Sequence, residues 1–235
     1  MTARRLAPEH HFTLGLLILT ASTGAIDAVS YLALDRVFTG NMTGNVLFLG
    51  FGLVGIGGIP FLNNSIALIG FIIGSIVSGR IIGRNQPKGL PVSSRWVLGV
   101  GAVLIVLLAV FWLTVGTLAH IELLVVTGLL AVVMGAQVSA VKPIGNSDVT
   151  TIVVTNTVAN LARDSRLAGG KGEKWLSRLG AVVAMGVGAA IGAAAVHWSG
   201  GPAALVAAAI IFSLGTLTLV WATRRHHEHQ RHAEA

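Results

Sequence analysis

One acidic residue stands alone inside a long apolar stretch near the start of the chain. Asp27 lies in the segment 12–34, on a polar stripe whose other members recur at helical spacing: Thr20, Thr23, Ser30 and Tyr31. A carboxylate inside a bilayer costs about 2.5–3.5 kcal/mol on insertion scales, so we expect Asp27 to face the interior of a helix bundle. There it could couple a proton, bind a cation or hydrogen-bond a solute. The alternative is a structural partner for a nearby loop.

Two polar stretches interrupt the apolar sequence and resemble each other. The first hinge, Phe38–Gly50, reads FTGNMTGNVLFLG, and the second hinge, Thr150–Ala162, reads TTIVVTNTVANLA. A shift of 112 residues places Thr43 of the first on Thr155 of the second. Thr and Asn are strong helix N-caps, and glycine permits tight turns and close backbone approaches. Each stretch therefore predicts a turn that begins a short helix.

The two turns define the candidate site. In the first hinge the chain would turn at residues 43–45 and a helix would start at Val46; in the second a helix would start near residues 155–157. Irregular backbone at membrane depth is tolerated only where it is buried or lines a watery cavity. The predicted solute or pore residues are Asp27, Thr39, Asn41, Thr43, Gly44, Asn45, Thr155, Asn156 and Thr157. The alternative is two ordinary loops between spans.

The composition indicates which elements must position these residues. Of the 235 residues, 54% are hydrophobic and 11% charged, against roughly 45–50% and 25% in soluble domains. Six apolar segments have about the length of 20 residues that a membrane-spanning helix needs. They are 12–34, 61–83, 96–116, 119–141, 178–199 and 202–222. Two shorter segments, 40–58 and 149–162, follow or contain the two polar stretches. The fold class is all-α, a polytopic helical membrane protein in contact with the lipid bilayer.

The basic residues predict which segments cross. If only the six long segments cross and the N-terminus is inside, 15 of the 16 Lys and Arg residues lie inside and only Arg36 lies outside. If all eight segments cross, the split falls to 10 against 6. The positive-inside rule therefore favours about six transmembrane helices, two short re-entrant or broken segments, and cytoplasmic termini. It also accounts for the net charge of +7 without a nucleic-acid partner.

This topology makes the two halves inverted copies within a single integral membrane domain, 1–235. The halves 12–116 and 119–222 each read span, short segment, span, span, but they begin on opposite sides. Small-xxx-small motifs begin at Gly74 and Gly188 in corresponding segments, and they suit packing within one chain or between copies in a homo-oligomer. A basic, His-rich cytoplasmic tail, 223–235, completes the chain; it could hold a metal, but a disordered basic tail is the favoured interpretation.

The sequence offers few groups for catalysis. It contains no cysteine, and neither a nucleophile with a base nor a second acid accompanies Asp27 within the spans. No catalytic residue, metal site or cofactor is predicted, and an enzyme is not expected. A small-solute transporter or channel with a site near the middle of the membrane is the leading hypothesis, with the solute open. A scaffold or regulator that meets a cytoplasmic partner or anionic lipid is the alternative, and an intramembrane enzyme is less favoured.

The segment GAIDAVSYLALDRVFTGNMTGNVLFLG, residues 24–50, resembles the YoaK-like family of bacterial multi-spanning membrane proteins, a family of unknown function. The shared features are Gly-x-x-Asp-Ala, Tyr-Leu and, above all, Asn-x-Thr-Gly-Asn. The resemblance implies an inner-membrane protein with about six spans and brings no substrate or reaction. In its second half the family carries a Thr-Gly-Thr-like element where this chain has Thr155, Asn156 and Thr157, a departure that sets the two hinges apart.

Overall fold

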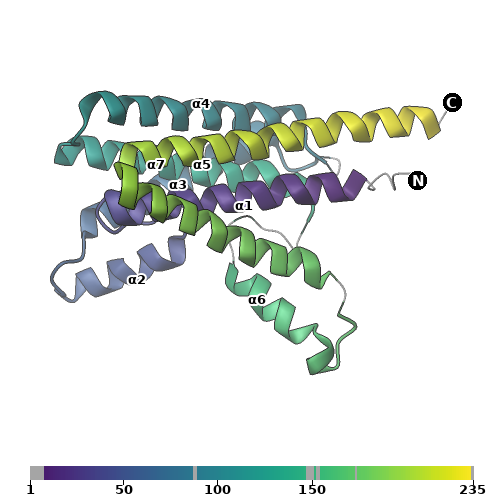
Figure 1. Cartoon of the computed structure of the whole chain (residues 1–235), viewed down its shortest axis with the longest axis horizontal. Coiled ribbons are helices and arrows are strands. Elements are labelled where there is room, and N and C mark those ends of the chain that lie inside the picture. The colour runs from purple at the N-terminus through teal and green to yellow at the C-terminus, as the bar shows by residue number, and fades with distance from the viewer. Residues whose placement is uncertain (1–7, 87–88, 147–150, 152–153, 173, 234–235) are drawn as a thin grey trace.

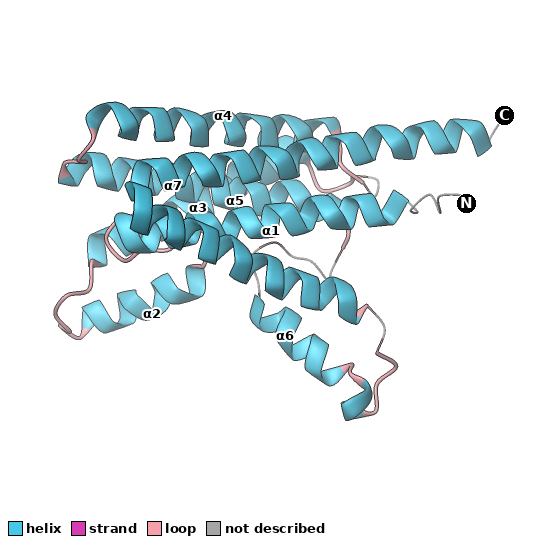
Figure 2. Cartoon of the chain, viewed as in Figure 1, coloured by secondary structure: helices cyan, strands magenta, loops and turns pink. Residues whose placement is uncertain are grey.

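The computed structural model describes residues 8–86, 89–146, 151, 154–172 and 174–233. Within these ranges all regular structure is helical, as the composition predicts (Figure 2). Five helices are long and apolar enough to cross a membrane: α1 (Pro8–Ala33), α3 (Phe61–Ile82), α4 (Val92–Val115), α5 (His120–Val141) and α7 (Trp175–Ala233). The shorter elements are α2 (Met42–Leu53), α6 (Val154–Arg163) and the single 3₁₀ turns η1 (Lys142–Ile144) and η2 (Arg166–Ala168).

Helix α7 is two helical arms joined by a break. Its 59 residues would extend about 89 Å if straight. Gly200, with φ 83° and ψ 169°, leaves the helical conformation, and Pro202 follows in the first turn of the second arm, where its missing N–H is tolerated. Figure 1 shows α7 turning back on itself, so both chain termini lie at the same end of the bundle. The break falls between the predicted segments 178–199 and 202–222.

Helix α1 packs backbone to backbone against the first arm of α7. Gly24 lies against the Met185 carbonyl, and Gly188 lies against the Ala21 carbonyl, so closely that a Cβ on either glycine would collide with the oxygen. Small residues at a helix contact allow this approach, and van der Waals packing then supplies the association that the hydrophobic effect cannot supply in lipid.

Helices α3 and α5 pack in the same manner. Gly135 lies against the Phe71 carbonyl, Gly74 lies against the Val132 carbonyl, and the Ser78 hydroxyl donates to the Ala136 carbonyl at 3.0 Å. The two sets of glycine contacts correspond residue by residue. A shift of 111 positions takes Ala21 and Gly24 onto their α5 counterparts, and a shift of 114 takes Phe71 and Gly74 onto their α7 counterparts.

The two short helices lie on one side of this bundle (Figure 1). Helix α2 packs mainly against α3, and α6 packs against α7. From their first residues they run in opposite directions: α2 toward the end where α1 finishes, and α6 toward the end that holds the chain termini. On the opposite side of the bundle, α4 packs against α5 and the second arm of α7 around the fully buried Phe212.

Candidate functional site

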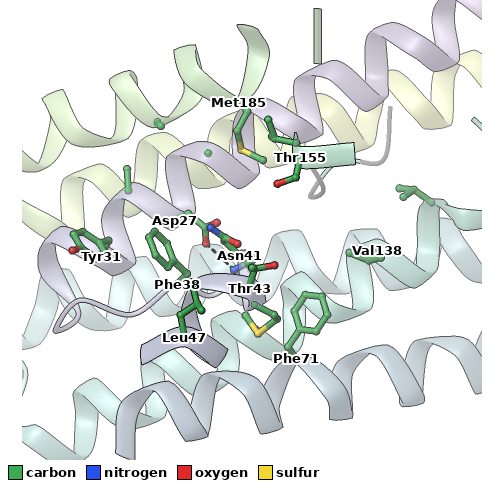
Figure 3. Close-up of a pocket in the computed structure, with 18 of the residues that line it drawn as sticks. Asp27, Tyr31, Phe38, Asn41, Thr43, Leu47, Phe71, Val138, Thr155 and Met185 are labelled. Carbon is green, nitrogen blue, oxygen red and sulfur yellow. Dashed lines mark hydrogen bonds between the residues drawn. The ribbon is translucent and has the colours of Figure 1, made fainter. Parts of the chain in front are cut away.

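A cavity of about 1180 Å³ lies where the two short helices begin. Met42 and Thr43 from the start of α2 and Val154 and Thr155 from the start of α6 all line it. The remaining wall comes from the loop between α1 and α2, from η1 and the residues after it, and from α1, α3, α5 and the first arm of α7. Figure 3 shows side chains from several of these elements around one space. Ligand pockets usually measure about 300–1,000 Å³, so the space would hold a small solute together with water.

Asp27 connects helix α1 to the first hinge. The residue is 8% exposed, and its Oδ1 accepts hydrogen bonds from the backbone N–H of Thr39 at 3.0 Å and of Gly40 at 2.7 Å. The expectation that Asp27 faces the interior is confirmed. The carboxylate both lines the cavity and fixes the backbone of the loop that enters it.

Asn45 fixes the same loop from the other side. Its side chain is fully buried; Oδ1 accepts from the Phe38 N–H at 3.0 Å, and Nδ2 donates to the Phe38 carbonyl at 2.6 Å. The prediction of a turn at residues 43–45 with a helix from Val46 was wrong, because α2 begins at Met42. Asn41 occupies the N-cap position without a side-chain capping bond, and the amide of Asn45 is engaged by the loop instead.

The predicted site residues divide into two groups. Five line the cavity: Asp27, Asn41, Thr43, Gly44 and Thr155. Four do not: Thr39, Asn45 and Thr157 are buried, and Asn156 is exposed on α6. The second hinge is described only at Thr151 and from Val154 onward; its remaining residues, including Thr150, lie outside the described ranges.

The sequence interpretation missed the aromatic part of the cavity wall. Tyr31 and Phe38 line the cavity, and their rings stack with centroids 4.9 Å apart. Phe48 of α2 stacks on both, at 6.5 Å from Tyr31 and 6.3 Å from Phe38. From the sequence, Tyr31 was placed on the polar stripe of Asp27, but it was not predicted as a site residue. Tyr31 is the only tyrosine of the chain and lies four residues after Asp27, on the same face of α1.

Two ion pairs surround the C-terminal end of α6. Arg178 donates to Asp164 Oδ2 at 2.7 Å and to the Asn160 carbonyl at 3.0 Å, and Arg163 donates to Asp164 Oδ1 at 3.1 Å. These hydrogen bonds, first that of Arg178, lower the pKa of the Asp164 carboxyl below its usual 3.8. Because Arg178 belongs to α7, it ties the end of α6 to the start of that helix.

Among the residues that the structure describes, no group of three His, Cys, Asp or Glu side chains lies close enough together to bind a metal ion. The side chains of the His-rich tail beyond Arg225 lie outside this description.

A helical bundle with five membrane-length apolar helices and two short helices that start at an internal cavity defines a polytopic helical membrane protein. A family model described as "Protein of unknown function (DUF1275)" matches residues 15–218, and the chain therefore belongs to this family. The chain is also 34% identical over 152 residues to the UPF0700 transmembrane protein YoaK of Bacillus subtilis (strain 168). That match spans 64% of this chain and 65% of the relative's length. The resemblance seen in residues 24–50 is confirmed. No solved structure matches the chain.

Proposed function

We propose that this protein is a small-solute transporter or channel of the bacterial inner membrane, with its site near the middle of the bilayer. One observation carries the proposal: two short helices, from corresponding places in the two halves of the chain, begin at the same cavity. Discontinuous helices whose N-termini meet near the midplane are a recurrent way to build a solute path, because their free N–H groups and partial charges face the solute.

The inverted repeat is part of this proposal. The residue-by-residue correspondence of the α1–α7 and α3–α5 contacts supports halves at 12–116 and 119–222. The opposite directions of α2 and α6 support inversion (Figure 1). With each arm of α7 counted as one crossing, the chain crosses six times and both termini lie in the cytoplasm, which places 15 of the 16 basic residues on that side.

The depth of the site follows from the same contacts. Gly24 and Gly135 occupy corresponding positions, and Gln137, close to the second, donates to the Thr23 hydroxyl, next to the first, at 3.2 Å. The midplane of an inverted repeat lies midway between equivalent residues, so it passes close to both glycines. Asp27 lies three residues beyond Gly24, or about 4.5 Å along α1. The carboxylate and the loop that it holds therefore belong near the centre of the bilayer, where a polar loop needs a watery cavity.

The cavity wall is mainly apolar, and the few polar groups on it would orient a small polar solute. Asn41, Thr43 and Thr155 contribute amide and hydroxyl groups from the two opposing helix starts, and these groups would replace hydration of the solute. Asp27 would couple or gate its passage, while Thr39, Asn45 and Thr157 would support the hinges from behind. Val138 stands on α5 where the shift of 111 residues places the counterpart of Asp27, so the second hinge has no matching carboxylate.

Flux through purified protein tests the function directly. Proteoliposomes would be screened by stopped-flow swelling with sugars, amino acids, monovalent anions and small organic cations. Thr155→Val should reduce the flux of a solute that permeates, because it removes a hydroxyl from the cavity wall. Asn156→Ala is the matched control, since this neighbour on the same helix lies off the wall. No flux above empty vesicles for any solute class would refute the proposal.

Topology is tested separately with a single cysteine at Asn146 in this cysteine-free chain. A membrane-impermeant maleimide should label it only after intact cells are permeabilised, because the entrance to the second hinge lies on the cytoplasmic side. Labelling of intact cells would mean that the short segments cross fully, and the inverted repeat would be lost.

A further inference from the structure

The residues that line the cavity are spread along the direction of α1, and those at the two ends of this lining differ. One end is lined by Lys142 and Asn146, and the Asn146 amide lies 3.4 Å from the Thr13 hydroxyl near the start of α1. The other end is lined by Tyr31. Thr13 and Tyr31 are 18 residues apart, or about 27 Å along the helix. Asp27 lies only about 6 Å from Tyr31 on this axis, so the solute site is close to the second end.

The second end is lined by the rings of Tyr31 and Phe38, with Phe48 stacked behind them. Phe38 stacks on Tyr31 with the rings 19° from parallel and on Phe48 with the rings 10° from parallel. Gly44 makes room for this arrangement, because a Cβ there would come within 2.8 Å of the Phe38 ring. Figure 3 shows Tyr31 and Phe38 beside Asp27, on the side of the cavity away from Thr155 and Val138.

The position of the Phe38 ring depends on the backbone that carries it. Asn45 binds both the N–H and the carbonyl of Phe38, at 3.0 and 2.6 Å. Asp27 binds the next two N–H groups along the chain, those of Thr39 and Gly40. A phenyl ring forms no conventional hydrogen bond, so the stacking contacts of Phe38 can separate without breaking one. A fixed backbone with a ring free to part from its neighbours is suited to a gate.

We propose that the stacked rings of Tyr31, Phe38 and Phe48 close the cavity at the end where α1 finishes, and that Asp27 and Asn45 are positioning residues for Phe38. The gate deepens the proposed function and rests on it. The structure then corresponds to a state open toward the chain termini and closed at the opposite face. The carboxylate that lines the solute site holds the same loop that carries the gate, so occupation of the site and opening of the gate are physically linked.

Accessibility of one cysteine measures the gate without any knowledge of the solute. Thr43→Cys places a thiol on the cavity wall of the cysteine-free chain. An impermeant maleimide would be applied to right-side-out and to inside-out vesicles. We expect labelling from the face that bears the chain termini and little from the other. Phe38→Ala should speed labelling from the closed face about tenfold or more, since two stacked pairs are lost.

Matched variants separate a gate from general loosening. Phe51→Ala should leave labelling unchanged, because this ring meets only the edge of Phe48, at 6.4 Å, and does not line the cavity. Phe38→Tyr should leave the gate closed, because a tyrosine ring keeps the stacking contacts. Asn45→Ala should open the closed face, and Asp27→Asn should open it less than Asp27→Ala, because an asparagine keeps an acceptor oxygen for the two N–H groups.

Each result has a defined meaning. Equal labelling from both faces in the parent, or no change in Phe38→Ala, overturns the gate. If Phe38→Ala does not fold, Phe38→Leu, which keeps most of the volume without a ring, is judged by the same criteria. Labelling from neither face in any variant refutes the watery cavity and the proposed function with it. Opening by Phe38→Ala in a protein that passes no solute supports the gate and refutes transport alone.

Discussion

Replacing Gly188 by alanine tests the contact between α1 and α7 at which, among the described glycines, a Cβ would come closest to the backbone of another helix. A Cβ at this position would collide with the backbone of α1 at Ala21, which cannot rotate away as a side chain could. The helices must therefore separate, and overpacking of this kind costs about 1–3 kcal/mol. Gly186→Ala, two residues earlier on the same helix, is the control, because a Cβ there meets nothing within 4 Å. The control should stabilise the fold by about 0.5–1 kcal/mol through helix propensity.

The corresponding pair in the other half should behave in the same way. Gly74 lies against the backbone of Val132, whereas a Cβ at Gly79 meets nothing within 4 Å. Gly74→Ala should therefore destabilise by an amount similar to Gly188→Ala, and Gly79→Ala should not. Unfolding by sodium dodecyl sulfate in mixed micelles, followed by tryptophan fluorescence, measures each free energy. Equal effects of Gly186→Ala and Gly188→Ala would refute the packing argument, and a neutral Gly74→Ala would remove the correspondence between the halves.

Two other perturbations follow from the hydrogen bonds. Asp27→Ala leaves two buried N–H groups without an acceptor and should cost about 2–6 kcal/mol in the same titration, whereas Asp35→Asn, an exposed carboxylate after α1, should be neutral. The lowered pKa of Asp164 means that its link to Arg178 stabilises the fold above about pH 4 and is lost as the pH falls below the usual 3.8. Pepsin should cut the loop before α7 faster as the pH falls through this range, and the Asp164→Asn protein should not show this pH dependence of cleavage. If Asp164→Asn shows the same pH dependence, another group is responsible for it.

Hydropathy was sufficient to predict the long helices. The five long helices lie where apolar segments were marked, and the break in α7 falls in the predicted gap, because glycine and proline interrupt an otherwise uniform run. Helix starts were less predictable. Asn45 has the residue type of an N-cap, yet it binds Phe38 in a loop seven residues earlier. Side chains that satisfy a loop backbone leave no periodic pattern, so tertiary contact overrode the local signal.

The candidate site was predictable in its polar part only. Asp27 and the threonines stand out because polar groups are costly in an apolar sequence, whereas phenylalanine in such a sequence is ordinary. The stack at Phe38 depends on a loop that returns to α1 and on the absence of a side chain at Gly44. Sequence spacing does not encode that return.

The break at Gly200 has a consequence for how the protein is made. Between Arg178 and Arg224 the sequence contains no Lys, Arg, Asp or Glu, and the turn that joins the two arms is a few small residues and a proline. An inserting chain would therefore have no charged loop to carry across the bilayer here. In the proposed topology the two arms would enter together as a pair, and the arginines at both ends would remain on the side of synthesis. The last quarter of the molecule would then reach its orientation without exporting a Lys, Arg, Asp or Glu side chain.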